Sequence, residues 1–107
     1  MAEGIYTLGA WKVKPGQNAA FVKAWRALGD VFAQLPRPPA AKGILIQSVA
    51  DPSLCYSFGP WRSLEDIQAM RSDPRAQEGI RKLAELCTEA TPGAFRVIAE
   101  SSAPRQS

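Results

Sequence analysis

Apolar residues fill both alternating sets of positions in the first patterned segment, Ile5 to Lys14. One set consists of Ile5, Thr7, Trp11 and Val13, and the other of Tyr6, Leu8 and Ala10. A strand with apolar residues on both sets is covered on both faces. The segment therefore predicts a strand that Pro15-Gly16 ends, with cover on each side of its sheet.

Large apolar residues recur every three or four positions in the next segment, from about Gln17 to Gln34. They are Phe21, Trp25, Leu28, Phe32 and Leu35. This spacing predicts an amphipathic helix that packs one face on a sheet. We assign Phe21, Leu28 and Phe32 to the core and leave two roles open for Trp25, core or cavity wall.

A prolyl loop at Pro36 to Pro39 leads to two apolar segments that predict a hairpin. The first is Gly43 to Val49 and the second is Leu54 to Trp61, with Asp51-Pro52 in the turn between them.

A second helix is expected to begin at Ser63, with Ser63 and Asp66 in the spacing of a helix start. We expect it to break at Ser72-Asp73-Pro74, because Asp73 can cap a new helix whose first turn accepts a proline. The second part is expected to run to about Glu89. Thr91-Pro92-Gly93 would stop it, Ala94 to Ala99 would form a last strand, and the tail Ser101 to Ser107 would fray.

The resulting order, βαββαβ, predicts an α+β fold of the ferredoxin-like type: a four-stranded antiparallel sheet with both helices on one face. We expect a single domain over residues 1–107, ordered from about 5 to 100. The other sheet face also carries apolar residues, and the chain has no further element to cover it. A second copy is the simplest cover, so we predict a homodimer joined through its sheet faces.

The composition of the chain excludes several classes of catalytic and metal site. The chain has no histidine, which removes His-dependent triads, most zinc sites and histidine-ligated haem. Its net charge of +3 is scattered and indicates no polyanion site. Cys55 and Cys87 are expected to be buried reduced thiols. No segment has the length of a membrane span or the pattern of a secretory signal, so we expect a cytoplasmic protein without membrane partners.

Several short motifs resemble the dimeric α/β-barrel superfamily, and within it the antibiotic biosynthesis monooxygenase-like domains. They are Trp11-Lys12-Val13-Lys14-Pro15-Gly16 before Phe21 and Trp25, the Asp51-Pro52 hairpin, Ser57 to Glu65, and the helix break at Ser72-Asp73-Pro74. The resemblance covers about Ile5 to Glu100 and implies the same fold and a dimer.

The resemblance also implies two chemistries that the sequence can be tested against. The haem-degrading branch uses a histidine of the second helix, where this chain has Met70 and Arg71. The cofactor-free branch oxidises polycyclic phenols in a pocket lined by asparagine, tryptophan, tyrosine and arginine. Trp61, Tyr56 and Arg62 or Arg71 could supply part of that set, but the sole asparagine, Asn18, lies at the start of the first helix. No cofactor and no metal site are therefore expected.

Our site hypothesis is an apolar cleft for a small planar aromatic or quinol-type ligand. Its candidate residues are Trp25, Tyr56, Phe58 and Trp61, with Arg62 or Arg71 at the mouth. Strand alternation puts Tyr56 and Phe58 on the face opposite to Trp61, so we favour Trp25 with Trp61 as the ligand-binding pair and expect the other two at the dimer face. The competing interpretation assigns all these aromatics to core and interface.

Two alternatives stay open. One is a non-catalytic homodimer of the same fold that binds a small molecule or has a structural role. The other is an RNA-binding βαββαβ domain, which Tyr56-Ser57-Phe58-Gly59 faintly resembles; the missing basic-glycine motif and the scattered charge make us expect no nucleic-acid partner.

Overall fold

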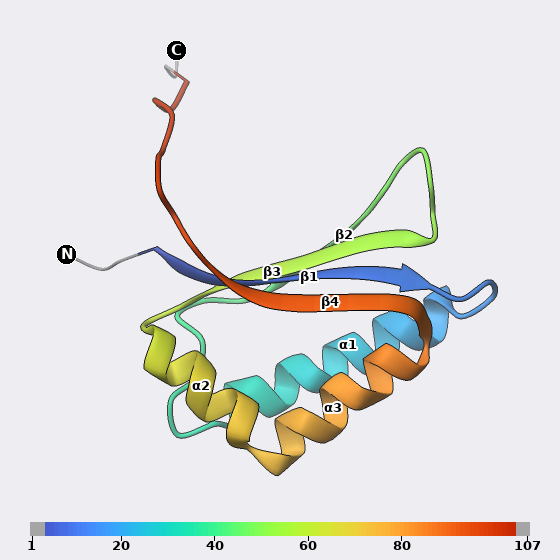
Figure 1. The fold of residues 1–107 in the computed structure, drawn as a ribbon, viewed down its shortest axis with the longest axis horizontal. Helices are drawn as coiled ribbons and strands as arrows, with labels where there is room; N and C mark the ends of the chain where they lie inside the picture. Colours follow the sequence, from blue (N-terminus) through green and yellow to red (C-terminus); the bar gives the residue numbers. More distant parts are fainter. Residues whose placement is uncertain (1–3, 105–107) are drawn as a thin grey trace.

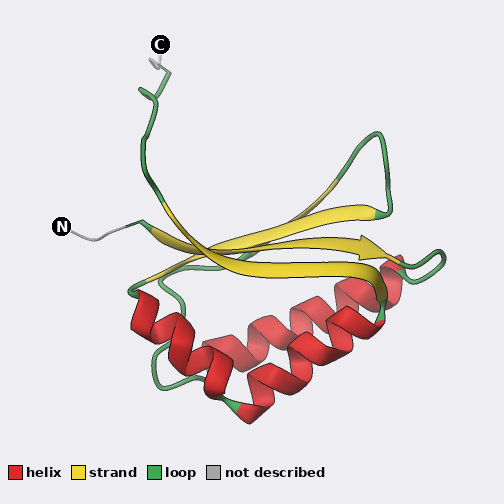
Figure 2. Ribbon diagram, viewed as in Figure 1, coloured by secondary structure: helices red, strands yellow, loops and turns green. Residues whose placement is uncertain are grey.

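The computed structural model describes residues 4–104 and has the predicted ferredoxin-like architecture (Figure 1). Its elements are β1 (Ile5–Val13), α1 (Asn18–Ala33), β2 (Ile44–Gln47), β3 (Leu54–Trp61), α2 (Leu64–Ser72), α3 (Pro74–Glu85) and β4 (Cys87–Arg96). The strands form one antiparallel sheet in the order β2-β3-β1-β4. The helices all lie on one side of it, which leaves the other side open (Figure 2).

The predicted helix break is confirmed. The Ser63 hydroxyl accepts a hydrogen bond from the Asp66 backbone N–H at 3.1 Å and so caps α2. Asp73 ends α2 and caps α3, where its carboxylate accepts from the Arg75 N–H at 2.8 Å, and Pro74 occupies the first turn of α3.

The predicted boundary between the last helix and the last strand is wrong. The helix ends at Glu85 rather than near Glu89, and the last strand begins at Cys87 rather than at Ala94. The apolar spacing after Ile80 suits a helix, but pairing with β1 extends the strand back over these residues. Pro92 does not stop the strand: it pairs with Gly9 inside β4, which is an edge strand, where a proline is tolerated.

The end of the chain continues past the sheet without regular secondary structure over residues 97–104 (Figure 1). Of the tail expected to fray, residues 105–107 lie outside the described residues. Among the helices of residues 4–104, none is long and apolar enough to cross a membrane.

The core between helices and sheet consists of two clusters. One contains Trp11, Val13, Phe21, Leu28, Cys55, Leu83 and Cys87. The other contains Ile5, Leu35, Trp61, Ile67, Met70 and Ala76. Phe32 and Ile80 pack against both clusters and so connect them. The candidate functional site lies in the region where the two clusters meet.

Candidate functional site

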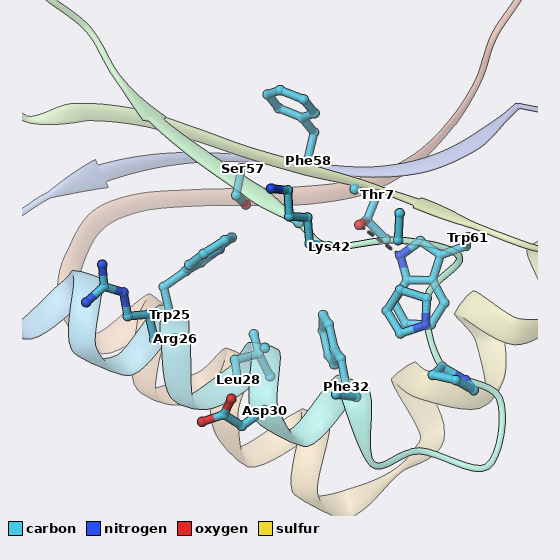
Figure 3. A pocket seen from close by; sticks show the side chains of 17 residues that line it. Thr7, Trp25, Arg26, Leu28, Asp30, Phe32, Lys42, Ser57, Phe58 and Trp61 are labelled. Atoms are coloured by element: carbon cyan, nitrogen blue, oxygen red, sulfur yellow. Dashed lines mark hydrogen bonds between the residues drawn. The ribbon is translucent and has the colours of Figure 1, made fainter.

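A cavity of about 640 Å³ lies between α1, the inner face of β1 and β3, and the loop before β2 (Figure 3). Aromatic side chains of both core clusters form its walls. Trp25 and Phe32 project into it from α1, and Trp61 closes it at the end of β3 (Figure 3). The cavity is therefore mostly apolar, as small-molecule sites usually are.

The cavity exists because the inward residues in the middle of the two strands are small. In the β1–β3 register Thr7 pairs with Gly59 and Gly9 with Ser57, whereas Trp11 pairs with Cys55 and Ile5 with Trp61. The Trp11 ring lies over Gly9, and the loop backbone at Gly43 lies over Gly59. The cavity is therefore left beside the short side chains of Thr7 and Ser57.

Both tryptophan rings at these ends donate hydrogen bonds to cavity hydroxyls. Trp61 Nε1 donates to Thr7 Oγ1 at 3.1 Å, and Trp11 Nε1 donates to Ser57 Oγ at 2.9 Å. In each case the hydroxyl lies diagonally across the β1–β3 ladder from the tryptophan. The bonds satisfy two indole donors that are nearly removed from water, with Trp11 4% and Trp61 3% exposed.

The proline-rich loop over the cavity is held at both of its sides. The Ala40 N–H donates to the Pro60 carbonyl at 2.9 Å, and Arg62 Nη1 lies 3.5 Å from the Pro38 carbonyl. Prolines 38 and 39 line the cavity and restrict the backbone there. The loop is therefore a preformed wall of the site.

Three charged residues line the cavity at its α1 and loop sides: Arg26, Asp30 and Lys42. None of them forms an ion pair with another described residue. Asp30 points away from the cavity in Figure 3, whereas Lys42 extends along its upper side. The Arg26 guanidinium also points away from the cavity (Figure 3), so Lys42 is the charged group that favours an anionic or electron-rich ligand there.

A second cavity of about 170 Å³ adjoins the first, and the two share Thr7, Phe32 and Ser57 as lining residues. Its far side includes Met70 and Arg71 of α2. Phe32 stands at the boundary and also packs edge-on against Trp61, with ring centroids 5.4 Å apart.

The structure brings together some of the residues that the sequence singled out. Trp25 and Trp61, the pair favoured for ligand binding, both line the large cavity. Phe58 contributes to the lining, but its side chain points to the opposite side of the sheet (Figure 3). That Trp25, Trp61 and Phe58 bind a ligand stays a prediction.

The other candidates lie elsewhere. Tyr56 is 39% exposed and shares the open sheet face with Phe58, as strand alternation predicted. Arg71 lines the small cavity, and Arg62 supports the loop without lining either cavity.

Sequence reasoning missed the polar lining: Thr7, Ser57, Arg26 and Lys42. Phe32, assigned to the core, also lines both cavities. A signal was present, because Thr7 and Gly9 interrupt an apolar inward set in β1 and Ser57 and Gly59 do the same in β3. At Thr7 and Ser57 this signal marks the cavity, whereas at Gly9 the Trp11 ring fills the space.

The thiols are confirmed as free and buried. Burial raises the pKa of Cys55, and burial followed by repulsion from Cys55 raises the pKa of Cys87, so both are protonated core side chains rather than nucleophiles. Asn18 donates to the Pro52 carbonyl at 3.0 Å and does not line the cavity. Within residues 4–104, no three His, Cys, Asp or Glu side chains are grouped so that they could hold a metal ion.

No family model and no curated protein sequence matches the chain. Its fold is nevertheless similar to several solved structures. SnoaB, a cofactor-independent oxygenase from Streptomyces nogalater, aligns with a TM-score of 0.78 at 17% identity and covers 97% of this chain and 100% of its own. A candidate antibiotic biosynthesis monooxygenase from Nitrosomonas europaea has a TM-score of 0.76 at 16% identity, covering 95% of this chain and 97% of its own.

Rv0793 from Mycobacterium tuberculosis aligns with a TM-score of 0.73 at 15% identity, covering 92% of this chain and 98% of its own. Identities this low establish the fold and leave the chemistry to the site. The antibiotic biosynthesis monooxygenase-like fold that the sequence resembles is the fold that this chain has.

Proposed function

We propose that the protein binds a small planar aromatic or quinol-type molecule in the large cavity and oxidises it with molecular oxygen without a cofactor. The observation that carries this proposal is a cavity of about 640 Å³ walled by Trp25, Phe32 and Trp61. Ligand sites are typically about 300–1,000 Å³, and aromatic walls suit a planar ring system. The similarity of fold to SnoaB, a cofactor-independent oxygenase, supports the same proposal.

The proposed reaction needs a substrate that ionises to an electron-rich carbanion or phenolate. For an anthrone-type substrate the balance is R₂CH₂ + O₂ → R₂C=O + H₂O: the methylene carbon loses both hydrogens, and oxygen is reduced to water and the new carbonyl. Lys42 extends along the cavity (Figure 3) and would favour the ionised substrate through its charge. The apolar walls would limit access of water to the intermediate.

The test is oxygen uptake with anthrone and with quinol substrates, each measured under air and under nitrogen. We expect anthraquinone to form with one O₂ consumed per product, and only under air. Trp25→Ala should lower turnover by about tenfold, because it removes an aromatic wall. Val22→Ala is the matched control on the same helix, since Val22 is exposed and does not line the cavity. Absence of oxygen-dependent turnover across the panel would overturn the oxygenase proposal.

A non-catalytic binding protein is the second candidate, and one observation favours it. The residue set implied by the cofactor-free branch is incomplete in the large cavity, which has tryptophans and Arg26 in its lining but, among the described residues, no asparagine or tyrosine. Asn18 binds the β2–β3 turn, Tyr56 lies on the other sheet face, and Arg71 lines the small cavity. Saturable binding of a planar ligand without oxygen uptake would support this candidate.

We also propose that two copies join through their open sheet faces. The exposed large apolar residues support it, since four lie on the strands of this sheet: Ile44 (43% exposed), Ile46 (49%), Tyr56 (39%) and Phe95 (53%). In the register Ile46 pairs with Tyr56 and Ile44 with Phe58, so these side chains share a face. An apolar sheet face of this kind is typical of an interface.

Sedimentation velocity tests the dimer. We expect a dimer for the wild type and a shift to monomer for Ile46→Lys, which would bury an unpaired charge at the interface. Val22→Lys places the same charge on exposed α1 and should leave the dimer intact. A wild type that is monomeric over the whole concentration range would overturn the dimer and leave the open face free for the RNA-binding alternative.

A further inference from the structure

Two hydroxyl groups on the cavity wall have protons that no described protein atom accepts. Thr7 Oγ1 and Ser57 Oγ each accept a hydrogen bond from an indole N–H, of Trp61 and Trp11 respectively. Because an indole nitrogen only donates, each hydroxyl must use a lone pair in this bond and keeps its own O–H proton. Within residues 4–104, neither hydroxyl donates a hydrogen bond to a protein acceptor.

The indoles that hold these hydroxyls have little freedom to turn. Trp11 and Trp61 are 4% and 3% exposed, and each packs against a phenylalanine of α1. A lone pair of each hydroxyl is therefore fixed on its indole, which restricts its O–H to the remaining directions. Both oxygens lie on the helix side of the sheet, facing the cavity (Figure 3).

The spacing of the two hydroxyls follows from the sheet register. Thr7 pairs with Gly59, two residues after Ser57, so Thr7 and Ser57 are diagonal neighbours on one face. The Cα atoms of diagonal neighbours in an antiparallel pair lie roughly 7–8 Å apart, and their side chains somewhat closer. Two oxygen atoms at opposite edges of one planar ring system suit this separation better than two oxygens on adjacent carbons.

Among the described residues, the charged side chains that line the cavity supply no acceptor for these protons. Lys42 can only donate, and Arg26 and Asp30 both point away from the cavity (Figure 3). A hydroxyl proton left without an acceptor in an apolar cavity is unfavourable once water is displaced. The ligand must therefore supply the acceptors.

We infer that Thr7 and Ser57 form a two-donor site that binds two acceptor oxygens on opposite edges of a planar ligand. The cavity would then select quinone-type carbonyls or phenolates over the corresponding hydrocarbon rings. This inference rests on the proposed binding of a planar aromatic molecule, and it adds the group on that molecule that the protein recognises.

A matched pair of probes separates the two claims: 2,3-dimethyl-1,4-naphthoquinone and 2,3-dimethylnaphthalene, measured by equilibrium dialysis. We expect the wild type to bind the quinone more tightly. Thr7→Val and Ser57→Ala should each weaken quinone binding about threefold to tenfold, the usual value of one hydrogen bond, without weakening binding of the hydrocarbon. Thr7→Ser keeps the hydroxyl and should keep the quinone affinity.

The outcomes distinguish this inference from the proposed function. If the wild type binds both probes equally, or if Ser57→Ala weakens both to the same extent, the two-donor site is wrong while binding of planar rings stands. If the wild type binds neither probe, the proposed function fails and this inference fails with it. The comparison of the two probes on the wild type needs no variant, so it holds even where Thr7→Val does not fold.

Discussion

Replacing Gly9 with alanine should destabilise the protein by displacing the Trp11 indole. A Cβ atom at Gly9 would lie 2.6 Å from Trp11 Nε1 and 2.7 Å from Cε2 and Cζ2. Contacts below 3.0 Å require something to move. Gly9 does not have a positive φ, so its requirement for glycine is steric. The ring that must move is 4% exposed and packs on Phe21 with centroids 5.8 Å apart.

The magnitude follows from three contributions. Forcing a buried side chain out of its packed position to make room for an added methyl group costs about 1–3 kcal/mol. Losing the hydrogen bond from Trp11 Nε1 to Ser57 Oγ leaves a buried donor unpaired, at about 1–3 kcal/mol. Alanine also lowers the conformational entropy of the unfolded chain, which offsets about 0.4–1 kcal/mol of the destabilisation. Mid-range values combine to a loss of about 3 kcal/mol in the free energy of unfolding.

Urea unfolding followed by tryptophan emission measures this loss, which should appear as a lower midpoint with an unchanged slope. Gly29→Ala is the matched control, since no atom lies within 4 Å of its added Cβ and α1 should gain about 0.5–1 kcal/mol. In a Trp11→Phe background, Gly9→Ala should cost much less than in the wild type. An equal cost in both backgrounds, or a change below about 0.5 kcal/mol in the wild type, would refute the reasoning.

Three further predictions concern the caps and the thiols. Ser63→Ala removes the cap of α2 and should lower the free energy of unfolding by about 1 kcal/mol in urea titrations, whereas Ser63→Asp should retain it. A hydrogen bond from Arg75 is the main cause that lowers the pKa of Asp73 below 3.8, so this carboxylate stabilises the fold above that pH. The stability advantage of wild type over Asp73→Asn should therefore vanish as pH falls below 3.8 through the lowered pKa; an advantage that persists there would contradict it. Cys55 and Cys87 should react with a thiol reagent only at the rate of unfolding, and rapid labelling of the native protein would show that they are accessible.

The sequence predicted the local features of this fold well where neighbouring residues decide them. The Ser63 cap, the break at Asp73-Pro74 and the opposite facing of Tyr56 and Trp61 all follow from short-range rules. The C-terminal strand was misjudged because its extent depends on pairing with β1, about 80 residues earlier in the chain, as the contact of Thr91 with Ala10 illustrates at a separation of 81. Because β4 is an edge strand, its pairing with β1 continues through Pro92, which short-range rules treat as the end of a helix and not as part of a strand.

The candidate site depends even more on distant contacts. Alternation alone places Trp61 on the helix side of the sheet, and helical spacing places Trp25 on the sheet side of α1. The hydroxyls that could recognise a ligand are defined by Trp11 with Ser57, 46 residues apart, and by Trp61 with Thr7, 54 residues apart. No sequence rule pairs these residues, because the β1–β3 register that brings them together is itself a product of folding. The sequence thus determined which residues face the helices, whereas the tertiary structure decided where small residues meet to form a cavity and which protons are left for a ligand.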